Sequence, residues 1–214
     1  MGNISSWLQG VSDRVPGAQK LDVDAAVRSV IREFCTKTLL WVKQLTAIDI
    51  IDGTASYTLT AATDQAIVTV ERVEVNGLYV PPTSMDVLDR EIPSWRDEES
   101  SQPSTFMVDA EKVLRLREIP TENITAGLVV WVAVKPSPTT DTIPDFIFND
   151  WYETILDGAV SYLLKMPNKV WSNIQGGEYY NDYYKADLSE AKNRKVTGKT
   201  KLSIRVQQQP FYVV

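Results

Sequence analysis

The sequence predicts an α+β fold: a helical bundle with an inserted antiparallel β domain and an extended C-terminal arm. Three observations favour it. Apolar residues recur at three- and four-residue steps before residue 43 and again after residue 144. The segment between them consists of short β-rich runs separated by turn signals. The last 23 residues carry six Lys or Arg and no Asp or Glu, whereas the other 191 carry 28 acidic against 16 basic residues.

The first helix is expected over residues 22–43, with Asp22 as its cap. Residues 1–20 show mixed signals, and Trp7 there is assigned to either the core or an interface. The helix has one apolar face and therefore needs partners. That face consists of Val23, Val27, Val30, Ile31, Phe34, Thr38 and Trp41.

Short strands are expected next. Residues 57–60 form one, and residues 67–75 form another whose alternation slips near Glu71-Arg72, which indicates a bulge. Asn76-Gly77 predicts a tight hairpin turn, because both residues tolerate positive φ. Ser84 is expected to cap a short helix, and residues 93–104 are expected to be an exposed loop. A second hairpin covers residues 105–117, and residues 128–134 read as a central strand covered on both faces.

Two more helices are predicted after the β segment. The second begins near Pro144 and ends at Met166, before Pro167. The third spans residues 171–194 and is weakened at Gly176-Gly177. Its inward residues are predicted to be Tyr180, Tyr183, Tyr184, Leu188 and Ala191.

The first helix has no helical partner until residue 145, so the helices are expected to meet across the β segment. We expect residues 1–46 and 142–194 to form the bundle, residues 47–141 the β domain, and residues 195–214 the arm.

Composition excludes several function classes. The chain has no His and only Cys35, so a Ser-His-Asp triad, a Cys-His pair or a structural zinc site cannot form within one chain. We expect no enzyme activity, metal or cofactor. A glycosidase with two carboxylates would need a chosen pair brought together, and no pair is indicated. No apolar run is long enough for a membrane span, and the start lacks signal-peptide features, so a cytosolic origin is expected.

Two sets of segments resemble tailed-phage head-to-tail adaptor proteins. The first is residues 26–35, Trp41 and residues 53–59; the second is residues 143–146, 156–159, 163–167 and Trp171, followed by the helix from Tyr180 to Ala191. The resemblance implies a structural protein of the virion neck, made in the host cytoplasm. It implies a homo-oligomeric ring, typically a dodecamer, that binds beneath the portal protein and contacts a downstream tail or nozzle protein. DNA would pass through its channel without sequence-specific binding.

The arm is the predicted portal-docking site, by strand addition or groove docking. Its candidate residues are Lys199, Lys201, Leu202, Ile204, Arg205, Val206, Phe211 and Tyr212. Leu202, Ile204 and Val206 alternate with polar residues. The alternatives are a disordered terminus, a strand folded back on the chain's own β domain, or a DNA-binding tail of a packaging factor. A different neck or tail-completion ring is also an open alternative.

A subunit interface is predicted on the third helix. Of four clustered tyrosines, two are expected in the core and two facing solvent or a neighbouring subunit; the interface candidates are Tyr179, Tyr183 and Trp171. Asp97-Glu98-Glu99 could bind a cation or a basic partner, and Asp22 with Asp24 could be metal ligands; Asp145, Asp150 and Glu153 surround the start of the second helix. A solvated loop explains the first group, and helix capping or dipole complementarity explains the others better.

Overall fold

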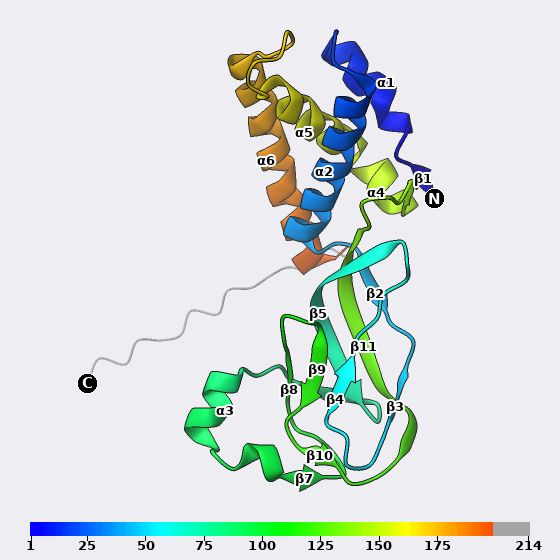
Figure 1. Cartoon of the computed structure of the whole chain (residues 1–214), viewed down its shortest axis with the longest axis vertical. Coiled ribbons are helices and arrows are strands. Elements are labelled where there is room, and N and C mark those ends of the chain that lie inside the picture. The colour runs from blue at the N-terminus through cyan, green and yellow to red at the C-terminus, as the bar shows by residue number, and fades with distance from the viewer. Residues whose placement is uncertain (199–214) are drawn as a thin grey trace, which may run out of the picture.

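The structure is a computed structural model that describes residues 1–198. Most of the helices gather at one end of the molecule and most of the strands at the other, where one short α-helix also lies (Figure 1). This confirms the predicted α+β class. The helices are α1 (Ser6–Arg14), α2 (Lys20–Thr38), α3 (Met85–Glu91), the 3₁₀ helix η1 (Trp95–Asp97), α4 (Asp145–Asp150), α5 (Tyr152–Leu164) and α6 (Ile174–Thr197).

Helix α5 is the centre of the helical end, where it packs against α2, α6 and α1. Its buried side chains include Ile155, Ala159 and Leu163, spaced at three- and four-residue steps. At Gly158 the three main helices come close together. A Cβ built there would lie 2.6 Å from Val30 Cγ1 of α2 and 2.9 Å from Tyr184 Cδ2 of α6. Only glycine fits this crossing without displacing a neighbour.

Helix α1 was not predicted from the sequence, in which residues 1–20 show mixed signals. Trp7 is fully buried: it stacks on Tyr152, and its indole N–H donates to the Tyr152 carbonyl oxygen at 2.9 Å. Just before α1, strand β1 (Gly2–Asn3) pairs with β12 (Thr142–Ile143). Both contacts join the chain's first residues to the segment that follows the β region.

Helix α2 is shifted from the predicted 22–43. It begins at Lys20 after Gln19, so Asp22 lies in the first turn and does not cap the helix. It ends at Thr38 because Leu39 adopts a left-handed conformation (φ 54°), an infrequent termination for a residue with a Cβ. Trp41 is therefore outside the helix, although it is buried.

The two later helices also differ in detail. The predicted second helix is split at Trp151 into α4 and α5, because Trp151 has φ −127° and ψ 22°. The third begins at Ile174, so Gly176 and Gly177 belong to its first turn and do not weaken its middle. Gly177 allows close packing on α5, where the Ser161 hydroxyl donates to the Gly177 carbonyl oxygen at 2.8 Å. The helix continues to Thr197, beyond the predicted Arg194.

The strand end contains two main antiparallel sheets that share one core. The larger has the order β2-β11-β5-β6, with β3 also paired to β11; the smaller has the order β4-β9-β8. A short parallel pair, β7 with β10, lies apart. The strands are β2 (Val42–Gln44), β3 (Ile48–Ile50), β4 (Ser56–Thr58), β5 (Gln65–Val75), β6 (Leu78–Val80), β7 (Glu99–Ser100), β8 (Phe106–Val108), β9 (Val113–Leu116), β10 (Ile119–Pro120) and β11 (Ile124–Pro136).

Most local predictions for the strands are confirmed. The β5–β11 register shifts between Val70 and Arg72, so the bulge lies at Glu71. Asn76 and Gly77 both have positive φ and connect β5 to β6. Residues 128–134 lie in β11 at the middle of the larger sheet. One part of that prediction is wrong: Val129 and Trp131 are only half-buried, so β11 is fully covered on one face alone.

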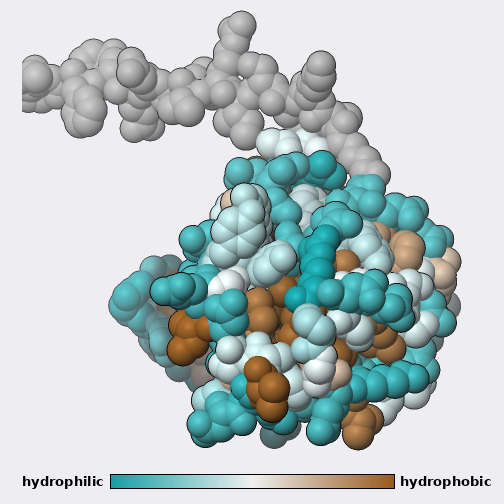
Figure 2. Space-filling model, turned by 90° about the horizontal axis from the view of Figure 1, so that it is seen from above, coloured by the Kyte–Doolittle hydropathy of each residue, from teal (hydrophilic) through white to brown (hydrophobic). Residues whose placement is uncertain are grey.

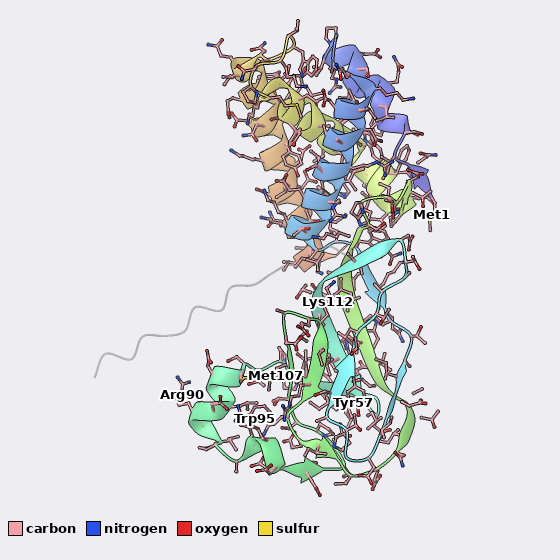
Figure 3. All side chains as sticks on the ribbon, viewed as in Figure 1. Met1, Tyr57, Arg90, Trp95, Met107 and Lys112 are labelled. Carbon is pink, nitrogen blue, oxygen red and sulfur yellow. The ribbon has the colours of Figure 1, made fainter. Side chains whose placement is uncertain are left out.

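Residues 93–104 are not simply an exposed loop. They include η1, in which Trp95 is fully buried in a small separate core with Leu88 and Met107 (Figure 3). The guanidinium groups of Arg96 and Arg115 lie 4.5 and 4.7 Å from the Trp95 ring. The prediction failed because this loop uses a single tryptophan, without periodicity, to hold α3 against the smaller sheet. Ser84 does cap α3, accepting a hydrogen bond from the Val87 amide.

Candidate interaction surfaces

Within residues 1–198 no group of three or more His, Cys, Asp or Glu is placed to hold a metal ion. Cys35 is fully buried, and this burial raises the pKa of its thiol to about 12. Two of the acidic candidates lie in ion pairs with nearby basic residues: Asp22 with Lys169 at 3.2 Å and Asp24 with Arg28 at 2.8 Å. No helix among the described residues has the length and apolarity to cross a membrane.

The outer face of α6 carries two exposed tyrosines. Tyr179 and Tyr183 are 59% and 50% exposed, their rings are 4.9 Å apart, and the Tyr179 hydroxyl donates to that of Tyr183 at 3.3 Å. Tyr184 is buried, and Tyr180 is half-buried against the core. The division of the tyrosines into two inward and two outward is thus observed. The inward assignment of Tyr183 was wrong, because it is one residue off the stripe of Tyr184, Leu188 and Ala191.

Trp171 lies in the connection between α5 and α6 and is half-buried against the core. Its indole N–H is buried without a partner among the described residues, and Lys169 Nζ lies 5.1 Å from its ring centre. Next to it, Val170 and Ile174 are 100% and 67% exposed. Seen from the helical end, hydrophobic atoms appear in several separate places between hydrophilic ones (Figure 2).

The last turn of α6 is fixed to both ends of the molecule. Lys195 Nζ donates to the Leu39 carbonyl oxygen at 2.6 Å and pairs with Glu71 of β5 at 3.0 Å. Arg194 pairs with Glu190 and Asp150, and its guanidinium lies 4.8 Å from the Trp151 ring. A pocket of about 250 Å³ lies beside this turn and includes Leu40, Phe146 and Gly198 in its lining. The arm therefore begins from a fixed point.

The predicted docking residues of the arm lie outside the described residues 1–198. These are Lys199, Lys201, Leu202, Ile204, Arg205, Val206, Phe211 and Tyr212. Of the six basic residues in the C-terminal segment, Lys192, Arg194 and Lys195 belong to α6. Arg194 and Lys195 are already in the ion pairs given above.

The sequence matches one protein family. The sequence profile of the family described as SU10 adaptor protein matches residues 1–206. The chain belongs to the SU10 adaptor protein family. The resemblance to phage adaptor proteins is thereby confirmed, and the family places the chain among the structural proteins of bacteriophage virions. A search of curated proteins finds no match.

The family match also clarifies the organisation of this SU10 adaptor family member. It runs through both helical segments, the β segment and the arm as far as Val206. Leu202, Ile204 and Val206 are thus within the family pattern, whereas Phe211 and Tyr212 are beyond it. Neither α1 nor the core around Trp95 was predicted from the sequence. A helical spacing of Ile4, Trp7, Val11 and Val15 was the available signal for α1.

Proposed function

We propose that this protein forms a head-to-tail adaptor ring that docks beneath the portal through its C-terminal arm and connects the DNA-filled head to the tail. The observation that carries this proposal is the family match, which extends into the alternating part of the arm. An apolar strand face is unfavourable in water, whereas an added strand gains main-chain hydrogen bonds and side-chain burial. Many arms acting together in one ring would multiply a weak individual contact.

Ring formation needs surfaces between subunits, and we propose that Tyr179, Tyr183 and Trp171 lie at them. Tyr179 and Tyr183 form an exposed aromatic pair that the chain's own core does not use. Tyr is favoured where one end of a side chain is buried and the other stays wet. We propose a homo-oligomeric ring, with twelve copies as the working number. The strand end would then face a downstream tail or nozzle protein.

The second candidate, a DNA-binding packaging factor, is less well supported. Arg194 and Lys195 are in ion pairs with Asp150, Glu190 and Glu71, so binding phosphate would break existing contacts. The net charge of the chain is −6. A negative body suits a channel through which DNA must slide without being held.

The portal contact is tested by mixing the protein with its portal protein and imaging the mixture by electron microscopy. We expect a ring stacked on one portal face. Replacing Leu202, Ile204 and Val206 by Asp should reduce portal binding more than Lys201→Gln with Arg205→Gln. Stronger damage from the Gln pair, together with steeply salt-dependent duplex binding, would support the DNA-binding alternative. A ring that binds only tail components would indicate a different neck protein.

Ring assembly is tested by Tyr179→Ala combined with Tyr183→Ala. Both side chains are exposed, so folding should be retained while ring formation on the portal falls. Tyr162→Ala on α5 is the matched control, because Tyr162 is 46% exposed but lies outside the α6 pair. If Tyr162→Ala reduces ring formation as much as the Tyr179→Ala, Tyr183→Ala double variant does, the α6 tyrosines have no specific role in the subunit interface.

A further inference from the structure

A groove of about 410 Å³ lies between β5 and the β8–β9 hairpin. Residues 67–70 of β5 form one wall, and β8 with its following turn forms part of the other. β5 pairs with β11 along one edge, but on its opposite edge β6 covers only residues 73–75. Among the described residues, no strand pairs with residues 67–70 on the groove side. Figure 3 labels Met107 and Lys112, which belong to the hairpin wall.

The backbone of β8 also has open groups on this side. The Phe106 amide donates to the Pro81 carbonyl oxygen at 3.1 Å, and the Phe106 carbonyl oxygen accepts from the Thr83 amide at 2.7 Å. Backbone groups two residues apart in a strand point to the same side. The N–H and C=O of Val108 therefore point away from β9, where no described residue pairs with them. The Val108 side chain is 38% exposed and lines the groove.

We propose that in the free protein this groove binds residues 202–206 of the chain's own arm as an added strand. Open strand edges recognise extended peptides through main-chain bonds, while alternate side chains enter apolar sites. Leu202, Ile204 and Val206 supply that alternation. Val108 supplies one donor and one acceptor, and the apolar side chains of β5 and β8 supply the surface.

The starting point of the arm favours this occupant. Lys195 pairs with Glu71 of β5 at 3.0 Å, only four residues along the strand from Ile67. An extended chain spans up to about 3.5 Å per residue, so the four residues from Gly198 to Leu202 can cover about 14 Å. A tether this short gives an effective concentration on the order of millimolar. The chain's own arm therefore outcompetes an arm from another molecule in dilute solution.

The irregularity of β5 favours β8 as the strand that would form main-chain hydrogen bonds with the arm. The β5–β11 register shifts twice, beside Glu71 and again between Ile67 and Thr69. Such bulges interrupt an edge and oppose continuous pairing with a second copy of the sheet. The arm would then take its main-chain bonds from Val108 and pack its apolar side chains against β5.

This arrangement would cover the apolar face of the arm before assembly. The groove proposal concerns the free protein alone and does not depend on the portal. Its consequence for docking does rest on the proposed function: the portal would have to displace the arm from the groove, because the same three side chains serve both contacts.

The test is amide hydrogen exchange of the full-length free protein, followed by NMR. We expect the amides of residues 202–206 to exchange at least about tenfold more slowly than an unstructured chain. Val108→Lys should remove this protection, because it places a cation against a basic arm and removes apolar contact. Val170→Lys is the matched control: Val170 is fully exposed in the connection before α6, far along the chain from the arm, and its replacement should leave the protection intact.

A second variant leaves the folded part of the chain unchanged. Ile204→Pro removes a backbone donor and breaks strand pairing, so it should abolish arm protection and expose the Val108 amide to exchange. Arm amides that exchange at unstructured rates in the unmodified protein would overturn the proposal. Protection of the arm amides that survives Val108→Lys would also overturn the proposal. Protection that is lost on tenfold dilution would overturn it as well, because the groove would then bind the arm of another molecule. Loss of portal binding alone would contradict only the proposed function.

Discussion

Tyr184 of α6 packs directly against the backbone of Gly158 in α5. A Cβ at Gly158 would lie 2.9 and 3.0 Å from the Cδ2 and Cε2 atoms of the Tyr184 ring. The same Cβ would lie 2.6 Å from Val30 Cγ1, so the position cannot enlarge without moving two helices. The absence of one methyl group thus sets the separation of α2, α5 and α6.

Gly158→Ala should lower the free energy of unfolding. Overpacking of this kind typically costs about 1–3 kcal/mol, more than the gain of up to about 1 kcal/mol in helix propensity. Gly10→Ala in α1 is the control. Its Cβ would come too close to one atom, the terminal Cδ1 of Leu156 at 2.8 Å, which can rotate aside; the Tyr152 hydroxyl at 3.5 Å is in ordinary contact. Urea unfolding should rank Gly158→Ala as the less stable variant, and the reverse order would contradict the packing argument.

Tyr184→Phe should be neutral or stabilising. The Tyr184 hydroxyl is buried without a hydrogen-bond partner among the described residues, and burial raises its pKa. Removing an unsatisfied polar group while keeping the ring avoids a desolvation cost of about 1–3 kcal/mol.

Tyr57→Phe provides the comparison for that substitution. The Tyr57 hydroxyl donates to the Thr54 carbonyl oxygen at 2.6 Å, so its removal should cost about 1 kcal/mol. Thermal unfolding of both variants gives the ranking. A larger loss of stability for Tyr184→Phe than for Tyr57→Phe would show that the Tyr184 hydroxyl has a stabilising role.

Cys35 should not react with thiol reagents in the native protein. Burial raises its pKa to about 12, so at pH 8 only about one thiol in ten thousand is ionised. Ionisation grows as pH rises towards 12, but the fully buried sulfur also lacks access to reagent. Labelling followed by mass spectrometry should show modification in denaturant and almost none without it. Rapid native labelling would mean that α2 opens at this position.

The ion pair between Lys195 and Glu71 should contribute modestly to stability. Both side chains are 25% exposed, and partly exposed pairs typically contribute about 0.2–1 kcal/mol. A double-mutant cycle with Lys195→Met and Glu71→Gln measures the coupling directly. High salt should weaken the coupling. A coupling of zero would mean that the end of α6 is fixed by the Lys195–Leu39 hydrogen bond and the Arg194 contacts, without help from Glu71.

Local signals predicted much of the fold because each had a local cause. Asn76-Gly77 specifies a turn through its own backbone preferences, and the slip in alternation at Glu71 marked the bulge. The failures required information from distant residues. The left-handed Leu39 that ends α2 has no sequence signal of its own, since Gly is the usual residue there. Trp95 is buried only because β8 and α3 provide its surroundings.

The candidate surfaces were likewise predictable where local spacing determines them, and not where distant residues do. Spacing alone places Tyr179 with Tyr183 on one face of a helix and Tyr180 with Tyr184 on the next. Which face turns inward depends on the later residues Leu188 and Ala191, which continue the stripe of Tyr184. The groove beside Val108 could not be predicted, because it depends on which strand edges the two sheets leave unpaired.

The pairing of the first residues with the end of the β region has a consequence for synthesis. Gly2 pairs with Ile143, and Trp7 donates to the carbonyl oxygen of Tyr152, 145 positions later. During translation, α1 and α2 leave the ribosome long before α5 exists to cover them. The strands, whose partners come earlier, can associate first. The apolar faces of α1 and α2 therefore lack their main partner on the nascent chain, and we expect α5 to cover them only after residue 164 has been made.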